Sequence, residues 1–196
     1  MIHRLSLEIA DYLFYKKIIT IEKYEVYSYG LEMLISAVMG AVLILVCGIL
    51  TNSFVRSIIF YLLFVVIRMF TGGYHADSHL ACKATLLCSF ILINIAYFML
   101  RSRCDLMLFI LICVFNLVIV LLLSPVECVK KPLSDYVRKR NKVISVCLYL
   151  FVFLLSFILF YMSYNEEAVF PILVVSDISL LMYIGNIKER RRSNEN

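Results

Sequence analysis

Long apolar stretches separated by short polar breaks dominate this chain of 196 residues. Each stretch is close to the ~20 residues that a helix needs to cross a bilayer. No water is available there to satisfy the backbone, so each stretch is expected to be helical. We therefore predict an all-α integral membrane protein with six transmembrane helices. The predicted spans cover about residues 31–50, 54–70, 80–100, 105–124, 143–163 and 168–187.

The segment 1–29, before the first span, mixes charged and apolar residues in a helical pattern. Its apolar positions recur at helical spacing, at Ile2, Leu5, Ile9 and Leu13. Charged residues occupy the other faces, which is typical of an amphipathic helix lying in the membrane interface. Such a helix would serve as a membrane-surface anchor or as a surface that also meets a partner.

The composition supports a lipid environment. Hydrophobic residues make up 63% of the chain and charged residues only 17%. A soluble domain of this size cannot hide so much apolar surface, so we predict one membrane-embedded domain over residues 1–196, with the lipid bilayer as its solvent. The seven cysteines include no CxxC pair and no disulfide framework, which favours a reduced setting.

The basic residues predict the orientation. With a cytoplasmic N-terminus, all but three of the 19 Lys and Arg residues fall on the inner side, the exceptions being Arg56, Arg101 and Arg103. This asymmetry predicts that both termini are cytoplasmic, including the basic tail 188–196. The two ends of the second span carry Arg56 and Arg68, as snorkelling anchors would.

One cytoplasmic break, "RMFTGGYHADSHLACK" at residues 68–83, carries a concentration of reactive groups. The adjacent Gly72 and Gly73 allow the backbone to turn sharply. Asp77 or Ser78 would cap the third span, which places Cys82 in its first turns. The positive end of a helix promotes the thiolate form of a cysteine, so Cys82 is a candidate nucleophile.

A candidate base precedes this cysteine by seven residues. On one continuous helix His75 and Cys82 would lie on the order of 10 Å apart, too far for proton transfer. If His75 belongs to a loop that the glycines fold over the helix start, its ring comes within reach of the thiol. A Cys–His pair is the minimal apparatus for nucleophilic acyl transfer.

One other chemistry, a zinc site, remains open. His75, Asp77, His79 and Cys82 are all admissible zinc ligands, although the metalloprotease pattern H-E-x-x-H is absent, and we favour a site without metal. His79 and Lys83 otherwise fit interfacial residues with no catalytic part.

Polar residues inside the spans suggest a different class of protein, a small transporter or channel. Asp177, Asn94 and Asn116 would then line a path. The competing interpretation is interhelical hydrogen bonding, outside any catalytic machinery. A non-catalytic scaffold is a third possibility, and nucleic-acid binding is not favoured because the basic residues follow the topology.

The spacing of Arg68, Gly73, His75 and Cys82 resembles the motif of the accessory gene regulator B (AgrB) family, the membrane peptidases of Gram-positive peptide quorum sensing. The span number, the chain length and the amphipathic N-terminus support the resemblance over essentially the whole chain. It implies a plasma-membrane protein with Cys82 as nucleophile, His75 as general base and acid, and no cofactor. Arg68 and Gly73 are implied as required motif residues, and a homodimer is plausible.

The resemblance further implies a substrate, a short AgrD-type propeptide with an acidic C-terminal tail. The enzyme would cleave before the tail, hold the remainder as a thioester and promote its cyclisation to a thiolactone or lactone. A partly dry site favours cyclisation over hydrolysis. A basic segment between the fourth and fifth spans would attract the tail, or it merely follows the topology. Its candidate residues are Lys130, Lys131, Arg138, Lys139 and Arg140.

Overall fold

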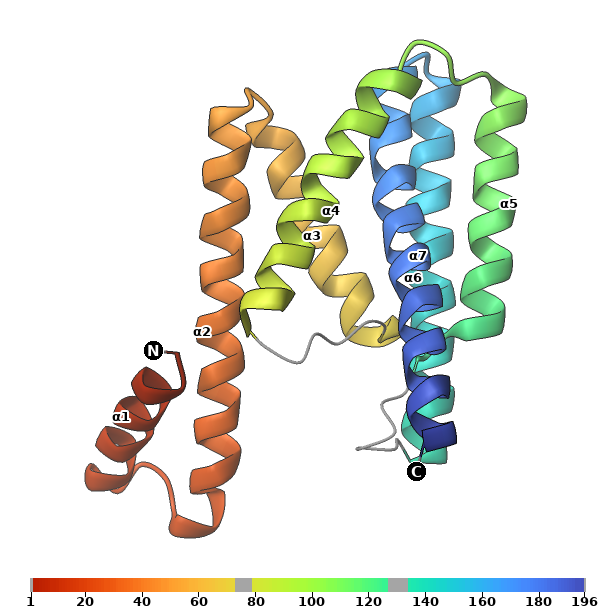
Figure 1. Ribbon diagram of the computed structural model, residues 1–196. Helices are drawn as coiled ribbons and strands as arrows, with labels where there is room; N and C mark the ends of the chain where they lie inside the picture. The colour runs from red at the N-terminus through yellow and green to blue at the C-terminus, as the bar shows by residue number, and fades with distance from the viewer. Residues whose placement is uncertain (1, 73–78, 127–133, 196) are drawn as a thin grey trace.

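The computed structural model describes residues 2–72, 79–126 and 134–195, and these residues form seven helices and no extended sheet (Figure 1). The helices are α1 (Ile2–Tyr15), α2 (Ile21–Leu50), α3 (Phe54–Thr71), α4 (His79–Leu100), α5 (Leu106–Leu123), α6 (Asp135–Tyr161) and α7 (Asn165–Glu195). Six of them, α2 to α7, are long and apolar enough to cross a membrane. The predicted all-α architecture with six spans is confirmed.

Several helices extend beyond the predicted spans. Helix α2 begins at Ile21 rather than near residue 31, and α6 begins at Asp135 rather than near residue 143. Helix α7 continues to Glu195, past the predicted end at residue 187. The hydropathy pattern marks where lipid ends, whereas backbone hydrogen bonding continues into polar sequence. The predicted segment 1–29 is consequently divided between α1 and the start of α2.

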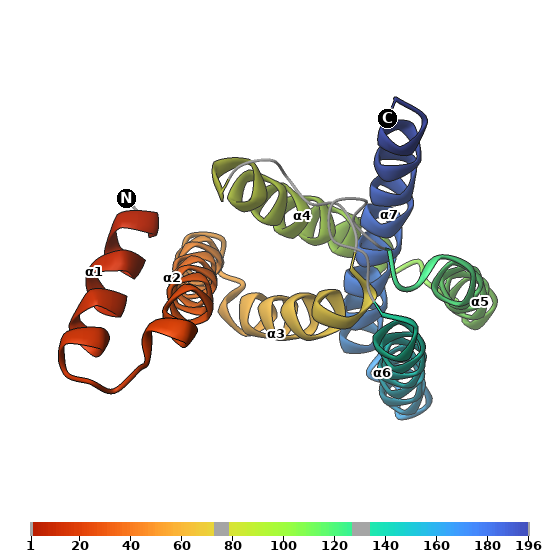
Figure 2. The same ribbon diagram turned by 90° about the horizontal axis from the view of Figure 1, so that it is seen from below.

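Helix α7 is the central element of the bundle. Within its most apolar part 72% of the residues are buried inside the protein, against 17% to 28% for the other five spans. Helices α3, α4, α5 and α6 all pack on α7, and Figure 2 shows them arranged around it. The main core joins residues of these helices, including Phe64, Ile67, Phe90, Val174 and Ile178. The outer helices therefore leave most of their apolar surface for lipid.

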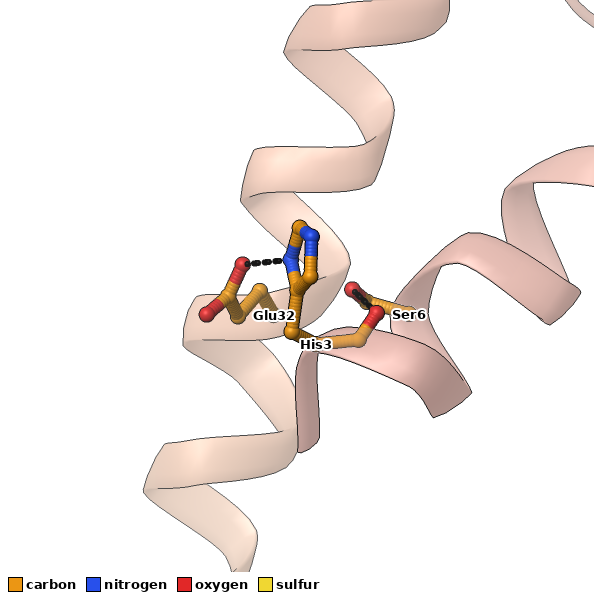
Figure 3. Close-up of polar contacts among 3 residues, drawn as sticks. All are labelled: His3, Ser6 and Glu32. Atoms are coloured by element: carbon orange, nitrogen blue, oxygen red, sulfur yellow. Dashed lines mark hydrogen bonds and ion pairs between the residues drawn. The ribbon is translucent and has the colours of Figure 1, made fainter. Parts of the chain in front are cut away.

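Helices α1 and α2 form an arm beside this bundle (Figure 1). The fully buried Ser6 and Ala10 allow α1 to lie close to α2. His3 Nδ1 lies 3.0 Å from Glu32 Oε2, and the Ser6 hydroxyl donates to the His3 carbonyl at 2.8 Å. Figure 3 shows both contacts. Of the predicted apolar stripe, Leu5 keeps 46% of its surface exposed, whereas Ile9 and Leu13 are half-buried.

Polar side chains inside the spans form bonds between helices. Arg56 Nε on α3 donates to Asn94 Oδ1 on α4 at 3.3 Å. Asn116 Nδ2 on α5 donates to the Ser176 hydroxyl on α7 at 2.8 Å. The interpretation of these asparagines as interhelical bonding groups is confirmed, because their amides are engaged within the bundle.

Candidate active site

Cys82 lies in the first turn of α4, because the helix begins at His79. Its side chain is exposed, and the thiol is free. The backbone N–H groups of a first helical turn lack carbonyl partners within the helix, so they create a positive environment. The placement of Cys82 at the start of this span is thus confirmed, and it suits a nucleophile.

Gly72 ends the neighbouring helix α3 in a conformation that requires glycine. Its φ is +68° and its ψ is −146°, a region that other residues rarely adopt. A Cβ atom here would lie 2.3 Å from the carbonyl oxygen of Val126. The predicted glycine turn therefore exists at Gly72, for two reasons: the positive φ and the close approach of another backbone.

This contact joins the end of α3 to the segment that follows α5. The Val126 N–H donates to the Thr71 carbonyl at 2.9 Å, and Gly72 and Val126 form an isolated parallel bridge. The chain continues from these two points into residues 73–78 and 127–133. The predicted site residues Gly73, His75, Asp77, Lys130 and Lys131 lie outside the described residues, so their roles stay predictions.

A cavity of about 390 Å³ opens between α2, α3 and α4 next to Cys82. Arg68 and Lys83 also line it, and none of its lining residues within the described part of the chain is acidic. The remaining lining residues are mostly apolar: Met33, Ser36, Ala37, Gly40, Tyr61, Phe64, Val65, Met69, Thr85 and Leu86. The site thus combines an exposed thiol, two cations and a largely apolar wall.

Arg68 turns into the protein instead of anchoring the end of its span at the membrane surface. Its guanidinium carbon lies 5.4 Å from the centre of the Phe64 ring, and its Nη1 atom is buried. It interacts electrostatically with Cys82 and with Asp177 of α7. The snorkelling interpretation is therefore wrong for this arginine, because an anion deeper in the bundle and an aromatic face draw it inward.

Lys83 and Asp177 are the polar residues near the site that the sequence did not assign to it. The half-buried Lys83 lines the cavity, with Nζ 3.4 Å from the sulfur of Met39. Asp177 is not among the lining residues, but it interacts electrostatically with Arg68, which is. The signal for Asp177 was its place near the middle of an apolar span, where a carboxylate needs a nearby cation.

The other candidate cations lie on α6. Ser134 caps this helix by accepting from the Val137 N–H at 3.4 Å. Arg138, Lys139 and Arg140 follow in the first turns and are exposed. The start of α6 lies at the same end of the bundle as the end of α3 and the start of α4 (Figure 1). These cations therefore face the same side as the candidate nucleophile.

A metal site is the remaining alternative. Within residues 2–72, 79–126 and 134–195, no group of three or more His, Cys, Asp or Glu side chains could hold a metal ion. The zinc hypothesis depends on His75 and Asp77, which lie outside these ranges, and on the side chain of His79, which is not described. It is therefore untested.

Comparison with known proteins gives independent information about the family of this chain. The family model for accessory gene regulator B (AgrB) matches residues 6–184. Putative AgrB-like protein 2 of Clostridium perfringens is 30% identical over 184 residues, covering 85% of this chain and 84% of the relative. Accessory gene regulator protein B of Staphylococcus aureus is 24% identical over 152 residues, covering 78% and 79%. No solved structure matches the chain.

Proposed function

Because this chain belongs to the accessory gene regulator B family, we propose that it is a membrane-embedded cysteine endopeptidase acting on an AgrD-type propeptide. Family membership and the six apolar helices make it a multi-pass bacterial membrane protein of the accessory gene regulator quorum-sensing system. In the proposed reaction the enzyme removes the C-terminal tail of the propeptide and promotes cyclisation of the remainder.

The observation that carries this proposal is the exposed Cys82 thiol beside the cavity between α2, α3 and α4. A peptide segment can occupy the cavity while its scissile carbonyl lies against the sulfur. The apolar wall limits the access of water to an acyl-enzyme, which favours attack by the substrate's own thiol over hydrolysis. Arg68 supplies fixed positive charge where the thiolate and the carbonyl oxygen carry negative charge.

The chemistry proceeds in two acyl transfers. Cys82 Sγ, after losing its proton to His75, attacks the carbonyl carbon before the tail, the C–N bond breaks, and His75 protonates the leaving amine. A thiol within the propeptide then attacks the thioester, so that Cys82 leaves and the thiolactone ring closes. The first transfer is uphill and the second nearly even, so release of the tail draws the sequence forward.

A matched pair of variants tests the nucleophile. Cys82 and Cys88 are both exposed on α4, but only Cys82 lines the cavity. Co-expression with the cognate propeptide, followed by mass spectrometry, should show tail cleavage in wild type and Cys88→Ala. Cys82→Ala should show neither cleavage nor an acyl-enzyme. Undiminished cleavage by Cys82→Ala would contradict the proposal.

The basic residues of α6 are proposed to attract the acidic tail, together with Lys130 and Lys131. We expect Lys139→Gln/Arg140→Gln to raise the KM for the propeptide, most strongly at low salt, because exposed charges are screened. The control is Arg190→Gln/Arg191→Gln at the end of α7, which removes the same charge from exposed positions on the same side. Equal effects of the two pairs would indicate bulk charge rather than tail recognition.

The orientation belongs to the same proposal, with the candidate site and both termini on the cytoplasmic side. Modification of Cys82 by a membrane-impermeant thiol reagent tests this placement. Labelling in inverted vesicles but not in intact cells is the expected result, and labelling from outside the cell contradicts it. The transporter alternative is not favoured, because Asn94 and Asn116 are engaged in bonds between helices.

A further inference from the structure

Asp177 is a half-buried carboxylate within the central helix α7, and Val174, Val175 and Ile178 beside it are buried. The hydroxyl of the buried Ser89 on α4 hydrogen-bonds to it. The Oδ2 atom of Asp177 is itself buried, and no hydrogen-bond partner lies near it within the described part of the chain. A carboxylate in such a place is costly unless a cation lies nearby.

The packing of the core brings such a cation to it. Phe64 and Ile67 precede Arg68 on α3, and they share one buried cluster with Val174 and Ile178, which flank Asp177. Both α3 and α4 pack on α7, and Asp177 of α7 interacts with Arg68 of α3 and with Ser89 of α4. Arg68 also lines the cavity beside Cys82. The guanidinium therefore interacts electrostatically with both the carboxylate and the Cys82 side chain.

We propose that Asp177 is a positioning residue for the reaction proposed above: its carboxylate holds the Arg68 guanidinium against the inner wall of the cavity, facing Cys82. Arginine near the end of a span has an alternative, since its long side chain can extend to the membrane surface. The inward position is retained because a buried anion and the Phe64 ring compensate the lost hydration. The Ser89 hydroxyl in turn holds the Asp177 carboxylate in place through its hydrogen bond.

The positioning role and a simple charge effect predict opposite changes in the alkylation rate of Cys82 when Asp177 is neutralised. Removing a negative charge near Cys82 favours the thiolate if nothing moves, so alkylation of the thiol would accelerate. If Asp177 positions Arg68, the guanidinium leaves the cavity in Asp177→Asn and the thiolate loses its cation. Alkylation then slows. The direction of the change distinguishes the two cases.

The experiment measures alkylation of Cys82 by iodoacetamide in the full-length protein in lipid nanodiscs. Peptide mass spectrometry follows Cys82, and the rate of each variant is compared with that of wild type at the same reagent concentration. Asp177→Asn should slow Cys82 alkylation roughly tenfold relative to wild type, because the thiolate loses a neighbouring cation, and Asp177→Glu should restore most of the rate. The kcat/KM of Asp177→Asn for propeptide cleavage should fall on the order of 10- to 100-fold, because the Arg68 guanidinium is displaced from its place beside Cys82.

Two further variants separate positioning from general stability. Arg68→Gln/Asp177→Asn should be no slower than Arg68→Gln alone, because residues acting as one unit are not additive. Asn116→Leu removes another bond to α7 and should lower stability without changing the Cys82 rate. If Asp177→Asn does not accumulate in membranes, Ser89→Ala replaces it and should slow alkylation about threefold in the same nanodisc assay.

An unchanged or faster Cys82 rate in a folded Asp177→Asn protein overturns the positioning role, as do additive effects in the double variant. If Ser89→Ala is used in place of Asp177→Asn, a Cys82 alkylation rate equal to that of wild type also overturns the positioning role. These results are independent of the nucleophile test. If Cys82→Ala retains full cleavage, the proposed function fails, while the alkylation ratio still decides whether Asp177 acts through Arg68.

Discussion

The contact between Gly72 and Val126 predicts a large loss of stability for a one-carbon change, Gly72→Ala. A non-glycine residue at this φ and ψ costs about 1–3 kcal/mol in backbone strain. The new Cβ would stand 2.3 Å from the Val126 oxygen, where ordinary contacts begin at 3.4 Å, so the two segments must separate by about 1 Å. That movement removes the 2.9 Å bond from the Val126 N–H to the Thr71 carbonyl, worth about 1 kcal/mol.

The sum is about 3 kcal/mol, which corresponds to a fall in Tm of roughly 10 °C for a chain of this size. The chain contains no tryptophan, so far-UV circular dichroism of the detergent-solubilised protein is a suitable assay. Gly30→Ala is the matched control, because a Cβ at Gly30 has nothing within 4 Å. Alanine in that helical position should stabilise by about 0.5–1 kcal/mol. Equal melting of Gly72→Ala and wild type would refute the packing argument.

Two other predictions follow from the close contacts of α2 and the charge of the cavity. Gly48→Ala should destabilise the packing of α2 on α3 by about 1–3 kcal/mol in the same melting assay. The reason is that the new Cβ would lie 2.3 Å from the buried Ser57 hydroxyl. A Tm equal to that of wild type would contradict this prediction. Lys83→Gln should raise the KM for an acidic-tailed propeptide about fivefold at low ionic strength, since it removes one of two cavity cations. The difference should shrink as salt is added, and a KM that never differs from wild type would exclude Lys83 from substrate binding.

The number and nature of the spans could be predicted from sequence because apolar length determines what can cross a bilayer. The placement of Cys82 at a helix start followed from the turn residues before it. Helix ends were less predictable: α2 begins at Ile21 within a charged stretch, since hydropathy reports the membrane boundary and not the last backbone hydrogen bond.

Some features of the candidate site could likewise be predicted from the sequence, and others could not. The sequence alone identified the candidate thiol at Cys82, the turn at Gly72 and an arginine four residues before it, because local spacing and residue chemistry carry those features. The tertiary structure decided that Arg68 points inward, that Lys83 lines the cavity and that Asp177 interacts with the guanidinium. Those relations depend on how α3, α4 and α7 cross, and residues a hundred positions apart leave no periodic trace of their contact in one sequence.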